Sequence, residues 1–205
     1  MYVLGGFDGN ATADVLKLDI TQGTWSRVAP MPEIRYAFAA CAVGTDIYVF
    51  GGSAADNQPQ ASVYKLDILS NAWSTLAPMP RACEFPSASV LEGLVYIVGV
   101  EDGREGRDVL CFDPIAGVWS TLASTLHSRR SGASFVVGRS LYVAGGVGTT
   151  SSVERYDVAS NTWTAVADML EGRIYFSALA IGSAGPAEEQ DLFDSLIAEA
   201  SRRRT

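Results

Sequence analysis

Short apolar runs recur along the chain, and each of them meets glycine. Residues 47–52 read IYVFGG, and the pattern returns as MYVLGG at 1–6, VYIVGV at 95–100 and LYVAGG at 141–146. A strand with one face in solvent alternates apolar and polar residues, whereas these runs are apolar at successive positions. The pattern therefore predicts short strands that are covered on both faces. Glycine supplies the backbone freedom where each strand ends, so Val100 in the third copy predicts a different turn there.

Each copy contains three further strand patterns. One precedes the glycine-ended run and is rich in alanine and serine: FAACAV (38–43), SASVL (87–91), ASFVV (133–137) and SALAI (177–181). The third strand of the unit ends in aspartate: VLKLD (15–19), VYKLD (63–67), VLCFD (109–113) and VERYD (153–157). The fourth begins at tryptophan, as in WSTLA. Turn residues separate the strands, and no helical period is visible before residue 186, so the repeat predicts an all-β chain.

The spacing of the repeat has a constant part and a variable part. Tryptophans stand at 25, 73, 119 and 163, each six residues after an aspartate. Each of the first three lies 26 residues before the next glycine of the repeat, whereas the interval from that glycine to the following aspartate varies between 12 and 16. A connection that changes its length lies on the surface, so these loops should share one face of the molecule.

Four-stranded sheets without helices to cover them can cover one another. Sheets packed face to face around an axis, with small residues innermost, form a β-propeller. A β-sandwich is the alternative, but it does not predict tryptophans that recur at intervals of 48, 46 and 44 residues. The positions that define the repeat are Gly5, Gly6, Trp25, Gly51, Gly52, Trp73, Gly99, Trp119, Gly145, Gly146 and Trp163.

The glycine pair, the Tyr–Asp region and the tryptophan, at a period near 46, resemble the Kelch repeat over residues 1–182. APMP at 29–32 and 77–80 is similar to adaptor-type Kelch proteins in particular. The resemblance implies four-stranded blades on a propeller that presents loops to a protein partner. In this family a terminal strand often completes a blade that begins at the other terminus.

The expected architecture is an all-β Kelch-type β-propeller of four four-stranded blades, followed by a short C-terminal α-helix. The blades are expected at about 1–29 completed by 176–182, at 36–77, at 84–123 and at 132–167. Four blades are few for this family, so the chain could instead belong to a larger or incomplete ring. An open ring would expose two apolar blade faces, which favours self-association.

Residues 183–205 change in composition and predict a linker with an amphipathic helix. Phe193, Leu196 and Ile197 lie on its apolar stripe. The helix is expected to dock on the propeller, or alternatively to bind a partner.

Composition excludes several classes of function. A net charge of −8 argues against nucleic acid and anionic membranes, and no apolar run is long enough to span a bilayer. Three cysteines without a CxxC pair predict free thiols, and no secretion signal is apparent. A cytoplasmic protein is expected, with a nuclear one as the alternative. His127 is the single histidine, which argues against a histidine-based metal site or triad, and no cofactor motif is present.

The candidate partner-binding residues lie in the connections between successive blades. Arg35, Arg129 and Arg173 stand ten residues after a tryptophan, where the third copy has Cys83. By resemblance, arginines here grip acidic groups of a partner peptide; the alternative is that they stabilise the repeat. The full candidate set, with the variable loops, is Arg35, Tyr36, Glu84, Phe85, Arg129, Arg130, Arg173, Tyr175, Asp56, Asn57 and Arg104.

The sequence thus favours a non-catalytic protein–protein interaction module: an adaptor, a scaffold or a subunit of a larger assembly. A sugar mutarotase or epimerase, with arginine and glutamate at the mouth of the pore, is the alternative. Glu84 buried beside Arg35 or Arg129 would support that alternative.

Overall fold

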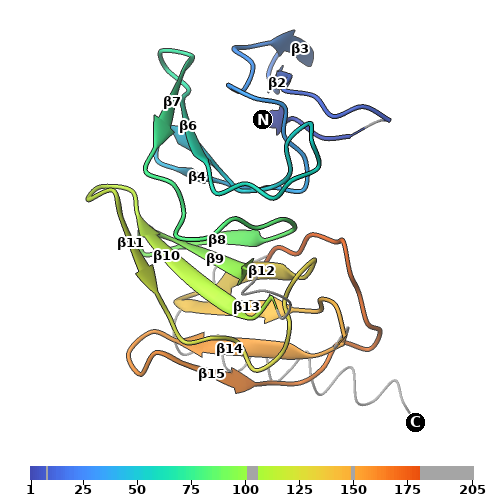
Figure 1. Cartoon of the computed structure of the whole chain (residues 1–205), viewed down its shortest axis with the longest axis vertical. Helices are drawn as coiled ribbons and strands as arrows, with labels where there is room; N and C mark the ends of the chain where they lie inside the picture. Colours follow the sequence, from blue (N-terminus) through green and yellow to red (C-terminus); the bar gives the residue numbers. More distant parts are fainter. Residues whose placement is uncertain (8, 101–105, 149–150, 181–205) are drawn as a thin grey trace.

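The computed structural model describes residues 1–7, 9–100, 106–148 and 151–180. Those residues form four antiparallel sheets and no helix, as the repeat predicts. Figure 1 shows the sheets following one another along the molecule in the order of the sequence. The chain is an all-β protein built from propeller-type blades.

The first blade has three strands and the other three have four each. The first consists of β1 (Tyr2–Leu4), β2 (Val15–Asp19) and β3 (Thr24–Arg27). The second consists of β4 (Ala39–Val43), β5 (Asp46–Phe50), β6 (Val63–Asp67) and β7 (Ala72–Leu76). The third consists of β8 (Ser87–Leu91), β9 (Leu94–Val100), β10 (Asp108–Asp113) and β11 (Val118–Thr121). The fourth consists of β12 (Ala133–Val137), β13 (Ser140–Ala144), β14 (Val153–Asp157) and β15 (Thr162–Ala165).

The core lies between neighbouring blades. Val15 of the first blade packs with Val49 of the second, and Phe50 of the second packs with Ile97 of the third. Val98 of the third blade packs in the same way with Val143 of the fourth. The doubly apolar strands are therefore explained by burial against two neighbours, and β8 lies between β4 and β12 along the inside.

Each tryptophan after the first joins its blade to the preceding one. The indole N–H groups of Trp73 and Trp163 donate to the carbonyls of Ala29 and Ala123, both at 2.9 Å. Trp119 donates in the same way to Ala77 at 3.4 Å. Each accepting alanine lies four residues after the tryptophan of the previous blade, so the recurring tryptophans make one repeated contact.

The aspartate before each tryptophan closes the turn between the third and fourth strands. The Oδ1 atom of Asp67 accepts hydrogen bonds from the backbone N–H groups of Leu69 and Ser70, at 2.8 and 3.0 Å. Asp19, Asp113 and Asp157 close their own turns with the same atom. The six-residue interval is thus the length of one side-chain-stabilised turn.

The closing strand expected from residues 176–182 is not seen, and the described residues agree with the alternative of an incomplete ring. Residues 177–180 form no strand, and the first sheet remains three-stranded. The first and last blades lie at opposite ends of the molecule (Figure 1), and the described residues 177–180 do not pair with β1. The described chain is an open arc of blades. The expected helix in 183–205 falls outside the described residues.

Two further expectations concern the third blade and the membrane. Gly99 and Val100 continue β9, which has seven residues, and the pairing with β10 shifts register between Asp108 and Val109. This turn therefore differs from those after Gly52 and Gly146, as Val100 predicts.

Within the part of the chain that the structure describes, no helix is long and apolar enough to cross a bilayer.

Candidate functional site

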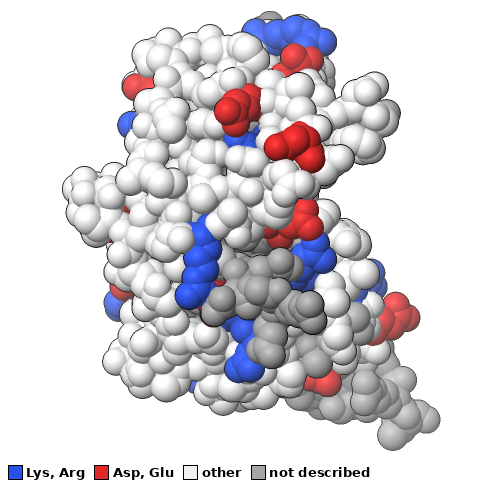
Figure 2. Space-filling model, in the orientation of Figure 1, with Lys and Arg blue, Asp and Glu red and all other residues white. Residues whose placement is uncertain are grey.

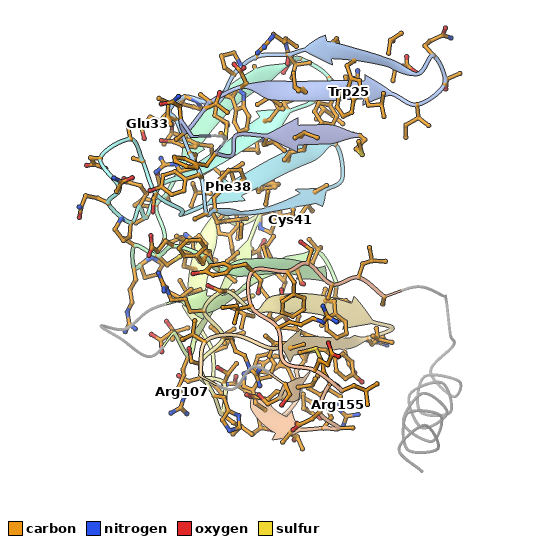
Figure 3. The ribbon with its side chains drawn as sticks, turned by 90° about the vertical axis from the view of Figure 1, so that its right-hand side faces the viewer. Trp25, Glu33, Phe38, Cys41, Arg107 and Arg155 are labelled. Atoms are coloured by element: carbon orange, nitrogen blue, oxygen red, sulfur yellow. The ribbon has the colours of Figure 1, made fainter. Side chains whose placement is uncertain are left out.

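Two sets of connections meet at one end of the sheets. One set follows the last strand of each blade (residues 28–38, 77–86, 122–132 and 166–176), and the other joins the second and third strands within a blade. We call this end the loop face. In Figure 3, Glu33 and Arg107 mark it, and Figure 2 views it directly. The sequence predicts this convergence, because both sets lie at the same end of an antiparallel meander.

A row of backbone hydrogen bonds crosses the mouth of the arc. The N–H of Phe85 donates to the carbonyl of Ala37 at 2.7 Å, Ser131 donates to Phe85 at 3.0 Å, and Tyr175 donates to Ser131 at 2.8 Å. All four residues have positive φ angles between 53° and 61°. We call this row the mouth ladder. It fixes the inter-blade connections through the backbone, in a conformation that non-glycine residues seldom adopt.

Arg129 is a structural residue and does not face a partner. Its side chain is fully buried, and its Nε atom donates to Oε1 of Glu154 at 3.1 Å. Its Nη1 atom donates to the carbonyls of Gly145 and Ser152. The carboxylate of Glu154 also accepts hydrogen bonds from the backbone N–H groups of Leu126 and His127, at 2.7 and 3.1 Å.

Arg35 is buried in the same way. Its Nη2 atom donates to Glu33 and to Ser62, both at 2.8 Å, and its guanidinium lies 5.4 Å from the centroid of the Tyr64 ring. Both arginines therefore hold the inter-blade connections against the third strand of the next blade. Of the two predictions made for these arginines, their burial agrees with stabilisation of the repeat and not with contact to a partner, because neither guanidinium reaches the surface.

The residues that do reach the loop face gather around Phe85. Glu84 accepts hydrogen bonds from Ser53 Oγ at 2.8 Å and from Arg130. The guanidinium of Arg130 lies 5.0 Å from the centroid of the Phe85 ring. Phe85 meets the ring of Tyr175 edge to face, with 5.1 Å between the centroids. Four connections of the loop face thus build one aromatic and charged group, which we call the Phe85 cluster (Ser53, Glu84, Phe85, Arg130 and Tyr175).

A second aromatic pair lies toward the first blade. The hydroxyl of Tyr36 donates to Asn57 Oδ1 at 2.6 Å, and the ring of Tyr36 lies 5.6 Å from that of Phe7, which is exposed. Asp56, beside Asn57, is also exposed. The sequence analysis did not single out Phe7, although it follows a glycine pair directly and so belongs to a variable loop.

The remaining predicted residues are not part of the Phe85 cluster. Arg173 is largely exposed and lies 3.7 Å from Glu171. Arg104 and the helix residues Phe193, Leu196 and Ile197 fall outside the described residues. His127 is partly exposed, and its Nδ1 atom lies 3.3 Å from Glu154.

An inner groove of about 310 Å³ opens beneath the mouth ladder. The first strands of the blades line it with small residues, and the Oγ atoms of Ser87 and Ser131 are buried there without a hydrogen-bond partner. The described residues that line it include no carboxylate, imidazole or amine. The groove can therefore accept hydrogen-bonding groups but offers no acid–base pair of its own.

The described residues give little support for metal binding or for a reactive cysteine. They contain no group of three or more side chains that could hold a metal ion. Burial raises the pKa of the Cys41 thiol to about 12 and that of Cys111 to about 11, so both thiols are protonated at neutral pH. Protonated thiols are poor nucleophiles and poor metal ligands.

Charge is distributed unevenly over the loop face. Figure 2 shows acidic side chains over the upper blades and basic side chains mainly around the middle and the lower blades. Glu33 and Asp56 lie beside a shallow pocket of the first two blades, whereas Arg130 belongs to the Phe85 cluster. A partner that spans the face therefore meets both signs of charge.

Comparison with known proteins assigns the repeat. Residues 1–183 match the family model described as the KLHDC2/KLHL20/DRC7 Kelch-repeats domain. The chain belongs to the Kelch-repeat family. This Kelch chain is 30% identical over 197 residues to Kelch-like protein 25 of Xenopus tropicalis, which covers 89% of the chain and 33% of the relative.

Two other proteins are similar to this chain, one in sequence and one in structure. Kelch repeat protein M-T8 of Myxoma virus (strain Lausanne) is 28% identical over 173 residues, which covers 80% of this Kelch chain and 33% of the viral protein. The chain thus spans about a third of the length of these curated relatives. A solved structure titled "Structure of YjhT" superimposes with a TM-score of 0.67 at 18% identity, covering 82% of this chain and 65% of that one. The last similarity shows the shared fold.

Proposed function

We propose that this Kelch chain binds a protein partner through its loop face, with the Phe85 cluster as the centre of contact. The observation that carries the proposal is the meeting of Phe85, Tyr175 and Arg130 from three different segments of the loop face. Aromatic and arginine side chains supply most of the energy in protein interfaces when they are held rigidly. The mouth ladder supplies that rigidity, because it fixes the backbone of Phe85 and Tyr175.

The partner segment that suits this cluster carries an apolar or aromatic anchor beside a polar group. Phe85 and the largely exposed Tyr175 offer ring faces, and the Glu84–Arg130 pair offers both an acceptor and donors. A purely acidic peptide is less favoured than the sequence suggested, because Arg35 and Arg129 are buried. Adaptor, scaffold and assembly subunit are roles that such a surface can serve.

The sugar isomerase alternative lacks a supporting observation. Glu84 is paired with Arg130 and Ser53 rather than buried beside Arg35 or Arg129. The inner groove, where a small substrate would sit, has no carboxylate among its described lining residues. The binding function is therefore the one that the site supports best.

Selection of peptides on the intact chain tests the proposal. A displayed peptide library is selected against the unmodified protein, and the affinity of the recovered peptides is measured for Tyr175→Ala and Arg130→Ala. Loss of an anchor should weaken binding by about tenfold or more, which corresponds to 1.4 kcal/mol. Leu69→Ala and Ile115→Ala are the controls, because both side chains are exposed on turns at the opposite end of the sheets.

The controls should leave the affinity unchanged. Peptides that bind the Tyr175 and Arg130 variants as tightly as the unmodified chain would place recognition elsewhere and overturn the proposal.

A further inference from the structure

Among the described residues, the first blade has one strand fewer than the others, and residues 177–180 have the pattern of the missing strand but no strand partner. In the three complete blades the innermost strand pairs with the second: β4 with β5, β8 with β9 and β12 with β13. β1 is the second strand of the first blade and pairs with β2 on one side. Residues 177–180 follow Tyr175 as 39–42 follow Ala37, yet they form no strand. A strand pattern without a partner and a strand edge without a neighbour thus occur together.

The outward face of the first blade is apolar and exposed. Met1, Val3 and Trp25 are 57%, 44% and 51% exposed. The equivalent residues of the fourth blade, Leu141, Val143 and Trp163, are 0%, 0% and 7% exposed because the third blade covers them. We call the surface formed by Met1, Val3 and Trp25 the head face. It has the composition of half of an inter-blade interface.

The fourth blade carries the complementary acceptor. Ala167 lies four residues after Trp163, as Ala29, Ala77 and Ala123 lie four residues after their tryptophans. Those three alanine carbonyls accept the indole N–H of the following blade, whereas Ala167 is exposed at the end of the arc. The mouth ladder also ends here, with the carbonyl of Tyr175 in the position to accept from a further blade.

We propose that two copies of this chain associate head to tail, with residues 177–180 of one copy pairing with β1 of the other and completing its first blade. The pairs Ala39–Phe50 and Cys41–Tyr48 set the register of the second blade. By that register Ser177 of one copy lies opposite Leu4 of the other, and Leu179 lies opposite Tyr2. Trp25 of the second copy then covers the fourth blade of the first and donates its indole N–H to Ala167.

A second copy fits this surface better than an unrelated partner. One occupant must supply an extended strand for the edge of β1, an apolar sheet for the head face and a carbonyl for Trp25. This chain presents all three at one end, in the spacing that its own internal interfaces use three times. The contact is heterologous, because different surfaces of the two copies meet, so it leaves one head and one tail available for further association.

The mass of the intact chain in solution, measured by light scattering over a wide range of concentrations, tests the proposal. The mass should rise from one chain to two or more with concentration, and tryptophan emission should shift to shorter wavelength as Trp25 is covered. Trp25→Arg places a charge on the head face and should prevent its burial. Leu179→Pro disrupts the tail, by which we mean the strand formed by residues 177–180, since proline cannot donate a hydrogen bond to a neighbouring strand. Both side chains are exposed, at 51% and 77%, so each variant should fold as a single chain.

The decisive measurement mixes the two variants. Each alone should stay monomeric, whereas an equal mixture should form a dimer of one copy of each, because one retains the tail and the other the head. Ile115→Arg, on a fully exposed turn at the other end of the sheets, should associate like the unmodified chain. Circular dichroism checks the fold of every variant, and Val3→Glu replaces Trp25→Arg if that variant unfolds.

Three results would overturn the proposal. They are a chain that stays monomeric at every concentration, a dimer that survives both variants, and a mixture of folded variants that stays monomeric.

Discussion

At the scale of single residues, the molecule uses two adjacent arginines in different ways. Arg129 is enclosed with Glu154 and carries part of the contact between the third and fourth blades. Its neighbour Arg130 points to the loop face and lies beside Phe85. A turn follows Arg129, in which the N–H of Gly132 donates to the carbonyl of Arg129 at 3.0 Å. The two side chains therefore have different surroundings: Arg129 stabilises the fold, and Arg130 belongs to the proposed contact site.

Replacing Glu154 by alanine should destabilise the fold by about 3–5 kcal/mol, because the buried Arg129 would lose its counter-charge. The free energy of unfolding in urea measures the effect. Glu92→Ala is the matched control, since Glu92 pairs with Arg139 on the surface and its loss should cost less than about 1 kcal/mol. An equal decrease in the free energy of unfolding for the two variants would show that the buried pair contributes no more to stability than the surface pair.

Alkaline pH should weaken the fold through the Cys41 thiol. Burial raises its pKa from 9.0 to about 12, so the folded state keeps a proton that the unfolded state loses. The stabilisation is complete below pH 9 and is lost as the pH rises toward 12. By linkage, stability should fall by about 1 kcal/mol between pH 8 and pH 10 from this group. Urea unfolding of Cys41→Ala should show a smaller fall over that range; an unchanged fall would assign the effect to other groups, such as Tyr96.

At the scale of the strand and the turn, most of the structure follows from local patterns. Each strand type has its own signature, and the aspartate and tryptophan positions correspond to one turn and one inter-blade hydrogen bond. The sequence therefore predicted the strands and the loop face. It did not show that Arg35 and Arg129 turn inward, because the direction of a loop side chain depends on the neighbouring blade. For Arg129 the signal was Glu154, an acid where the other copies have Leu16, Tyr64 and Leu110.

Substitution of the second glycine after β5 tests how tightly the chain is packed at this turn. Gly52 has a φ of 82°, and a Cβ there would lie 2.5 Å from the carbonyl oxygen of Tyr36. Gly44, at a hairpin turn, has a φ of 59° but nothing within 4 Å of the added atom. Gly44→Ala should therefore cost about 1 kcal/mol from backbone strain alone, and Gly52→Ala about 3 kcal/mol because the overlap adds to it. Thermal and urea unfolding of the two variants measure the difference; similar costs would mean that the connection at Tyr36 yields easily.

At the scale of the whole molecule, the blades stack in an arc and the ends of the arc stay apart. Closure depends on the angle between successive blades, and no single residue or motif encodes that angle. This is why the sequence predicted each blade but not the position of residues 177–180.

Hydrogen exchange should show the unequal cover of the blades. The first blade has three strands and an exposed head face, whereas the third is packed between two neighbours. In dilute solution, amides of β1–β3 should exchange faster than those of β8–β11, because local opening exposes less apolar surface at the end of the arc. Mass spectrometry of exchanged peptides measures the order. Equal protection of the two blades would indicate that the arc unfolds only as one unit.

The mouth ladder has an evolutionary consequence. Its bonds use main-chain atoms alone, and its four positions already hold alanine, phenylalanine, serine and tyrosine. Side chains at the rim can therefore be exchanged while the supporting geometry persists, so a lineage can acquire new binding specificity here without rebuilding its scaffold.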